Sequence, residues 1–259
     1  MRVGVSAITR PAQEAAKAAT PRIQALDVVR GAAILGMFFY HLSFDLAFFR
    51  VIAPSFPFLW PMRMFSHLVA GAFLALAGVS LALAYADRPL GMGFARRLIV
   101  LWAAAATVSL GTYAFAPEAY ISFGILHCIA AASVLGGLAT RAPAALSVAL
   151  GALLVAAPPL ADALGGHVAW PMALGLSGQE PMTLDWRPFA PWGGVTLLAS
   201  AAARSPWGHR ALQACAAWRS QSPFARGSAF LGRHSLMIYL VHQPIFFAGL
   251  SAYFWVSSA

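Results

Sequence analysis

Long apolar runs, interrupted by few polar residues, dominate the pattern along this chain. A helix needs about 20 apolar residues to cross a bilayer, and seven runs come close to or exceed that length. A membrane β-barrel would instead show short segments of alternating character. The runs are continuous and rich in Ala and Leu. The pattern therefore predicts an all-α, polytopic transmembrane helical bundle, with spans near residues 28–50, 66–86, 96–116, 119–139, 143–161, 188–204 and 234–255.

The segments outside these runs complete the domain prediction. Residues 1–21 lack the apolar core of a signal peptide, and we expect a mobile N-terminal tail. Residues 22–259 are expected to form a single transmembrane domain, with a basic loop at 205–227 on the inner side. This loop is predicted to be either a short helix lying on the membrane surface or an irregular segment. If the loop is helical, one face of the helix would carry Trp207, Ala211, Cys215 and Trp218, which lie at helical spacing.

Basic residues predict the orientation. The chain holds 17 Lys and Arg and 8 Asp and Glu, a net charge of +9. Positive residues at the inner ends of spanning helices explain this charge better than nucleic-acid binding does. With the N-terminus inside, the only basic residues outside are Arg50, Arg63 and Arg187. We therefore predict a multi-pass protein of the bacterial inner (cytoplasmic) membrane, with the C-terminus outside and no nucleic-acid partner.

Composition narrows the function classes. Charged residues make up 10% of the chain, against about a quarter in soluble domains. The two cysteines, Cys128 and Cys215, lie in an apolar run and in the basic loop, which favours neither a disulfide framework nor a Cys-based metal site. The sequence contains no HExxH, Walker, GxGxxG or GxSxG motif, and no metal is expected.

Ionisable residues inside the predicted spans are the candidates for chemistry. Charged groups cost free energy in a bilayer and usually face a cavity or the bundle interior. His41 and Asp45 lie four residues apart on one helix face, where the carboxylate would orient the imidazole as a general base. A structural contact between helices is the alternative for each candidate. The candidate catalytic residues His41, Asp45, His67 and His127 map to the outer half of the membrane, and His242 maps near the middle of the last span, at the floor of the polar cavity that they suggest.

A second group lies at the inner end of the bundle. Asp27 and Arg30 are three residues apart and expected to pair, and Gly31 permits close helix contact. Arginines clustered at this surface bind either anionic lipid or the phosphates of a cytoplasmic cofactor. The candidate cofactor-binding residues are Asp27, Arg30, Arg88, Arg96, Arg97 and Arg233.

Five segments, in order along residues 22–250, resemble a known family. The first has Arg, then Leu-Asp, then Arg-Gly, then an apolar helix that contains His41. Together they resemble the bacterial membrane proteins grouped with the catalytic domain of heparan-α-glucosaminide N-acetyltransferase, within the wider transmembrane acyltransferase group. The segments are "RIQALDVVRGAAILGMFFYHLSFDL", "HLVAGAFLALAGVSLAL", "FGILHCIA", "DWRPFAPWGGVTLLA" and "LGRHSLMIYLVHQP".

The resemblance implies a transmembrane acetyltransferase that uses acetyl-CoA from the cytoplasmic side as co-substrate. Its acceptor would be an amine or hydroxyl of a glycan or lipid-linked sugar on the outer side, and its partners would include membrane lipid and a second copy in a homodimer. The lysosomal enzyme carries a functional His in its first outer loop, but "VIAPSFPFLWPMRMF" has none. We therefore expect an acceptor other than heparan.

The missing His shifts the expected chemistry to other residues. His41, with His67 as second candidate, would act as base or acyl carrier, and Asp45 would orient His41. His127 or His242 would donate to the oxyanion. Two other functions stay open: a permease or binding subunit whose histidines relay protons, and haem binding by His41, His127 or His242.

Overall fold

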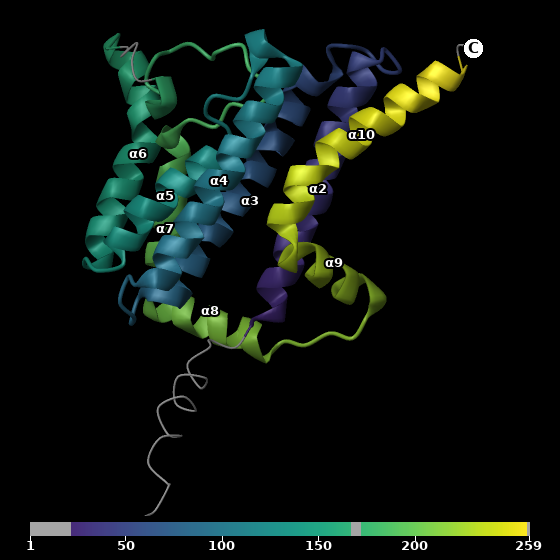
Figure 1. The fold of residues 1–259 in the computed structure, drawn as a ribbon. Coiled ribbons are helices and arrows are strands. Elements are labelled where there is room, and N and C mark those ends of the chain that lie inside the picture. The colour runs from purple at the N-terminus through teal and green to yellow at the C-terminus, as the bar shows by residue number, and fades with distance from the viewer. Residues whose placement is uncertain (1–21, 167–171, 258–259) are drawn as a thin grey trace, which may run out of the picture.

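The structure is a computed structural model that describes residues 22–166 and 172–257, and within these ranges every regular element is helical (Figure 1). The predicted tail at 1–21 lies outside the described residues. Two apolar helices, α5 (Ile125–Ala139) and α7 (Phe189–Ala203), have 15 residues each and are shorter than the helices long enough to span a membrane. The long spanning candidates are α2 (Gln24–Phe48), α3 (Trp60–Tyr85), α4 (Met92–Phe115), α6 (Ala144–Leu164) and α10 (Ser235–Ser257). The prediction of an all-α bundle with about seven membrane helices is confirmed.

The two short apolar helices do not reach the length of a full span. α5 (Ile125–Ala139) starts six residues after the predicted position at 119, and α7 comprises Phe189–Ala203. A 15-residue helix is about 22 Å long, less than the roughly 30 Å of a bilayer core. The remaining depth at one end is taken by non-helical segments, which membrane proteins tolerate where the backbone lines a cavity. The one-turn 3₁₀ helices of the connections are η1 (Phe56–Phe58), η2 (Pro117–Ala119) and η3 (Met172–Leu174).

Two amphipathic helices cross the end of the bundle at which α2 begins (Figure 1). α8 (Pro206–Ala217) and α9 (Pro223–Arg233) each start with a serine cap, because Ser205 accepts from Gly208 N and Ser222 accepts from Ala225 N. The basic loop is therefore helical, which is the first of the two predicted alternatives. The topology prediction places this end inside, and the end that holds the last turn of α10 outside.

Small residues allow the central helices to approach closely. Gly78 of α3 faces the backbone of α7, where a Cβ would overlap the carbonyl of Thr196. The hydroxyl of Thr196 is fully buried and donates to Leu74 O at 3.1 Å. These contacts fix α3 against α7, and both helices carry residues of the site described next.

α10 is the helix least embedded in the bundle. It crosses α2 obliquely, and its last turns lean away from the other helices (Figure 1). Leu236, Tyr239 and Leu240 pack on a small core formed by α4 and α5. The first half of α10 is thus the part that contributes to the interior.

Candidate active site

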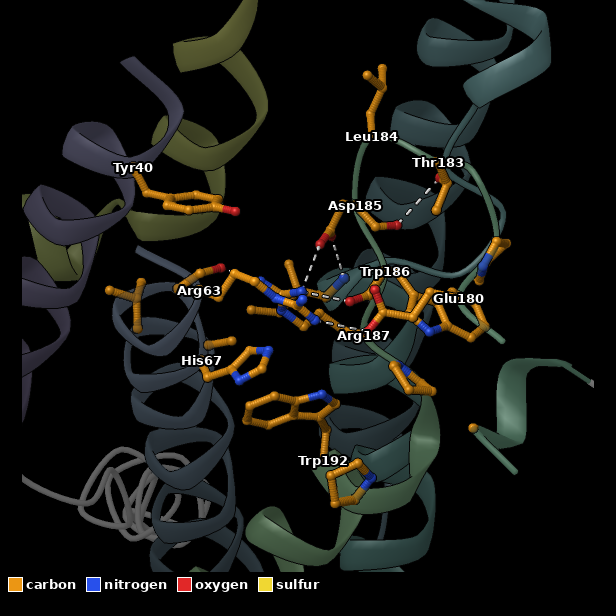
Figure 2. A pocket seen from close by; sticks show the side chains of 18 of the residues that line it. Tyr40, Arg63, His67, Glu180, Thr183, Leu184, Asp185, Trp186, Arg187 and Trp192 are labelled. Carbon is orange, nitrogen blue, oxygen red and sulfur yellow. Dashed lines mark hydrogen bonds and ion pairs between the residues drawn. The ribbon is translucent and has the colours of Figure 1, made fainter. Parts of the chain in front are cut away.

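A cavity of about 630 Å³, seen from close by in Figure 2, lies toward the end of the bundle opposite α8 and α9. We call it the outer cavity. It lies between α2, α3 and the loop before α7. Two of the five predicted catalytic residues line it from neighbouring helices. Its polar and aromatic lining includes Tyr40, His41, Ser66, His67, Arg187 and Trp192.

Arg187 is the cationic centre of the outer cavity. Its guanidinium donates to the hydroxyl of Ser66 on α3 and lies 4.0 Å from Asp185 Oδ1. The same group donates to Trp186 O at 2.6 Å and lies 6.0 Å from the centre of the Trp192 ring. Because these contacts hold it from several sides, the guanidinium is a fixed positive charge at the cavity wall. Such a charge can stabilise an oxyanion that develops during acyl transfer.

Asp185 links this cation to the start of α5. Its Oδ2 accepts from Ile125 N at 2.7 Å, which satisfies one of the N–H groups that a helix start leaves unpaired. A Cβ at Gly124 would overlap the same carboxylate oxygen, so this close approach requires glycine. Asp185 therefore fixes Ile125 and Arg187 relative to each other.

His41 meets its imidazole partner on the C-terminal helix. The ring centroids of His41 and His242 lie 4.9 Å apart in an edge-to-face arrangement. His242 is buried, and its Nδ1 donates to Tyr239 O at 2.7 Å. In the neutral ring this places the lone pair on Nε2, which has no hydrogen-bond partner among the described residues. His41 thus faces the cavity with His242 beside it.

The expected pairing of Asp45 with His41 is wrong. Asp45 is buried, and its Oδ1 accepts from Gln243 Nε2 at 2.6 Å. Within the described ranges, Asp45 Oδ2 and Gln243 Oε1 have no hydrogen-bond partner. His41 and Asp45 share one face of α2, but this proximity does not make them partners. The side-chain amide that binds Asp45 comes from α10. Asp45 therefore joins α2 to α10 instead of orienting the candidate base.

His127 has a local structural role and does not line the outer cavity in the described part of the chain. Its Nδ1 accepts from Gly124 N at 3.3 Å, and its Nε2 lies 3.2 Å from the hydroxyl of Ser109, which donates to Ile121 O. Both ring nitrogens are thus used in closing the loop before α5. This geometry does not support His127 as an oxyanion donor.

His67 lines the outer cavity one residue after Ser66. Its ring lies 5.4 Å from that of Trp192, edge to face, and Figure 2 shows both rings beside Arg187. Among residues 22–166 and 172–257, no group of three or more His, Cys, Asp or Glu side chains is placed to hold a metal ion. His67 is therefore a second imidazole at the cavity, contributed by α3.

A second cavity, of about 550 Å³, lies toward the inner end, and we call it the inner cavity. Arg30, Arg96 and Arg97 line it, and no acidic residue does so in the described part of the chain. Arg30 is held by Asp27 Oδ1 at 3.1 Å, as predicted, and by Ser80 Oγ at 3.1 Å. Arg97 Nε is buried without a partner among the described residues. This excess of guanidinium groups suits an anion such as a phosphate.

The structure separates the other predicted cofactor-binding arginines from the inner cavity. Arg88 is exposed on the loop between α3 and α4. Arg233 lines a different groove with Arg226 and Gln24, on the surface of α9. The sequence grouped these residues by membrane side alone. Their positions within the bundle place Arg30, Arg96 and Arg97 at the inner cavity and the other two arginines elsewhere.

One set of residues lines both cavities. Phe73 comes from α3, Ile125 from α5 and Tyr239 from α10. We call these three residues the shared wall. Tyr239 lies one turn before His242, so the wall adjoins the pair formed by His41 and His242. The two cavities therefore meet at the depth of the candidate base.

Comparison with known proteins identifies the family. Residues 22–244 match the family described as heparan-alpha-glucosaminide N-acetyltransferase, catalytic. The chain belongs to this family. Membership places it among transmembrane acetyltransferases, as the five sequence segments predicted, and the match includes the shared wall and both imidazoles of the His41–His242 pair. No curated protein and no solved structure gives a match.

Several residues of the heparan-α-glucosaminide N-acetyltransferase-like site were not assigned from sequence. Phe73, Asp185 and Tyr239 stood in the family-like segments, but nothing in their spacing connected them. Ser66 carried a weaker signal, because it directly precedes His67 in an apolar helix. Arg187 was expected, with Asp185, to precede the span at 188–204 in the outer polar layer, but no partner could be named for it. Their shared location depends on helices that are far apart in sequence.

Proposed function

We propose that this protein transfers an acetyl group from acetyl-CoA on the cytoplasmic side of a bacterial inner membrane to an amine or hydroxyl of an envelope glycan or lipid on the outer side. The observation that carries the proposal is the shared wall. A donor in the inner cavity and an acceptor in the outer cavity would meet at Phe73, Ile125 and Tyr239. Family membership supplies the reaction type.

The inner cavity suits the donor. Phosphate groups of acetyl-CoA would bind Arg30, Arg96 and Arg97 through charge-assisted hydrogen bonds. The unpartnered Nε of Arg97 is a donor that such a phosphate would satisfy. The apolar lining of the cavity, which includes Leu101 and Leu236, suits the pantetheine arm. The thioester would then lie toward the shared wall.

The outer cavity suits the acceptor and the chemistry. The acceptor nitrogen or oxygen attacks the thioester carbonyl carbon, a new N–C or O–C bond forms, and the C–S bond breaks with its electron pair on sulfur. His41 takes the proton from the attacking atom, and that proton passes to the CoA thiolate. The guanidinium of Arg187 stabilises the oxyanion of the intermediate. The adjacent ring of His242 keeps the imidazole of His41 in place.

The test is transfer of radiolabelled acetyl by the purified protein and by its His41→Ala variant. Glucosamine and a lipid extract of the bacterial envelope serve as acceptor probes. Loss of a general base lowers the rate by about 100-fold or more. The matched control is His209→Ala, because His209 is exposed on α8 and remote from both cavities.

Three outcomes would contradict this proposal or favour one of its alternatives. A His41→Ala variant that transfers acetyl at the rate of the unmodified protein would rule out His41 as the base. Absence of saturable acetyl-CoA binding, together with pH-dependent solute flux in proteoliposomes, would instead support a permease. A Soret band in the purified protein would support haem binding.

A further inference from the structure

The shared wall has a geometry suited to selecting the transferred acyl group by its size. This inference rests on the proposed function. Three bulky side chains from three helices meet where the two cavities adjoin: Phe73, Ile125 and Tyr239. An acyl group delivered from the inner cavity has to lie among them before an acceptor in the outer cavity can reach its carbonyl carbon.

Ile125 is held rigidly at this position. Its backbone N–H donates to Asp185 Oδ2 at 2.7 Å, and its side chain is 8% exposed. The same carboxylate lies beside Arg187, the cation of the outer cavity. Ile125 therefore cannot withdraw without breaking the cap of α5.

Tyr239 is also fixed from two sides. Its side chain packs on the core of Ala104, Ala105 and Leu126, and its carbonyl accepts from His242 Nδ1. Its ring lies 5.6 Å from that of His242. Tyr239 thus stands beside His242, whose ring in turn lies beside that of His41.

We propose that the shared wall selects short acyl donors, so that acetyl fits between Phe73, Ile125 and Tyr239 and longer acyl chains do not. Close-packed side chains adjust poorly to added methylene groups. A rigid apolar pocket distinguishes substrates that differ by one methylene by roughly 10-fold or more. The wall is thus a specificity determinant for the donor, separate from the arginines that hold its phosphates.

The experiment measures binding, so it does not depend on the acceptor. Purified protein in detergent is titrated with unlabelled CoA, acetyl-CoA, propionyl-CoA and butyryl-CoA in competition with radiolabelled acetyl-CoA. The unmodified protein is expected to bind butyryl-CoA at least about 10-fold more weakly than acetyl-CoA. Phe73→Ala is expected to bring this ratio of dissociation constants toward one.

Two further variants keep the test decisive. Phe73→Leu removes less volume and is expected to give an intermediate ratio, which guards against misfolding of the alanine variant. Leu101→Ala changes a residue that lines the inner cavity but is not part of the shared wall, and it is expected to keep the ratio of the unmodified protein. Monodisperse elution of each variant confirms that it is folded.

The outcomes separate the two proposals. If the unmodified protein binds no CoA ester, the proposed function itself fails. If it binds acetyl-CoA and butyryl-CoA equally, or if Leu101→Ala relaxes the ratio as much as Phe73→Ala does, the selection by the shared wall is wrong while the acetyltransferase proposal stands.

Discussion

At the scale of single residues, the partner of a buried polar group is decided by the helix that faces it. Asp45 lies one turn from His41 on α2, yet its oxygen accepts from Gln243 on α10. His41 in turn contacts His242, also on α10. These pairs join α10 to α2 together with the aromatic contacts that Phe38 makes with Phe246 and that Phe48 makes with Phe247.

The hydrogen bond between Asp45 and Gln243 leads to a prediction about stability. A double-mutant cycle of Asp45→Ala and Gln243→Ala, measured as the free energy of unfolding in micelles, is expected to give a coupling of about 1 kcal/mol. The value is small for a buried carboxylate because the unfolded state in the micelle also finds partners.

A matched control tests the specificity of this coupling. Ser43 is buried on the same helix, but its hydroxyl donates to Tyr40 O within α2. A cycle of Ser43→Ala with Gln243→Ala is expected to give no coupling. Equal coupling in both cycles would show that Asp45 does not bind Gln243 specifically.

At the scale of elements, the contact between α2 and α9 depends on backbone approach. A Cβ at Gly31 would overlap the carbonyl of Ser228, and a Cβ at Gly232 would overlap the carbonyl of Asp27. The two helices therefore pack backbone against backbone, which small residues allow. This packing holds the end of α2 that carries Arg30 at the inner cavity.

Gly31→Ala is predicted to destabilise the protein by about 1–3 kcal/mol, because the added methyl has to displace backbone atoms. The matched control is Gly227→Ala on α9, where a Cβ meets nothing within 4 Å. That variant is expected to gain up to about 1 kcal/mol from the helix preference of alanine. Thermal unfolding in detergent measures both. Equal effects of the two substitutions would contradict the close contact.

At the scale of the whole molecule, the two cavities require a defined orientation in the membrane. Basic residues predict that α8 and α9 lie inside and that the last turn of α10 lies outside. The inner cavity, with its three arginines, would then open toward cytoplasmic acetyl-CoA. The outer cavity, with His41 and Arg187, would open toward the envelope.

The native cysteines provide a test of this orientation. Cys215 lies half-buried on α8, whereas Cys128 is fully buried in α5. A membrane-impermeant maleimide is expected to label Cys215 in inside-out vesicles and not in intact spheroplasts. Cys215→Ser should abolish the labelling. Labelling of Cys215 in intact spheroplasts would reverse the predicted topology and both assigned cavity openings.

The sequence by itself determined the helical class, the approximate spans, the family and the layers in which polar residues lie. It could do so because a bilayer imposes the length and apolar character of each span locally, and because charges at helix ends follow the membrane side. Even the pair of Asp27 with Arg30 could be predicted, since both residues lie within one turn.

Only the tertiary structure decided which residues share a site. His41 with His242, Asp185 with Ile125, and the three residues of the shared wall come from segments distant in sequence. Their meeting depends on how each helix is rotated and where it begins, which are set by packing against neighbours. Apolar runs of similar composition fit a membrane in many rotations, so their pattern leaves these partners undetermined.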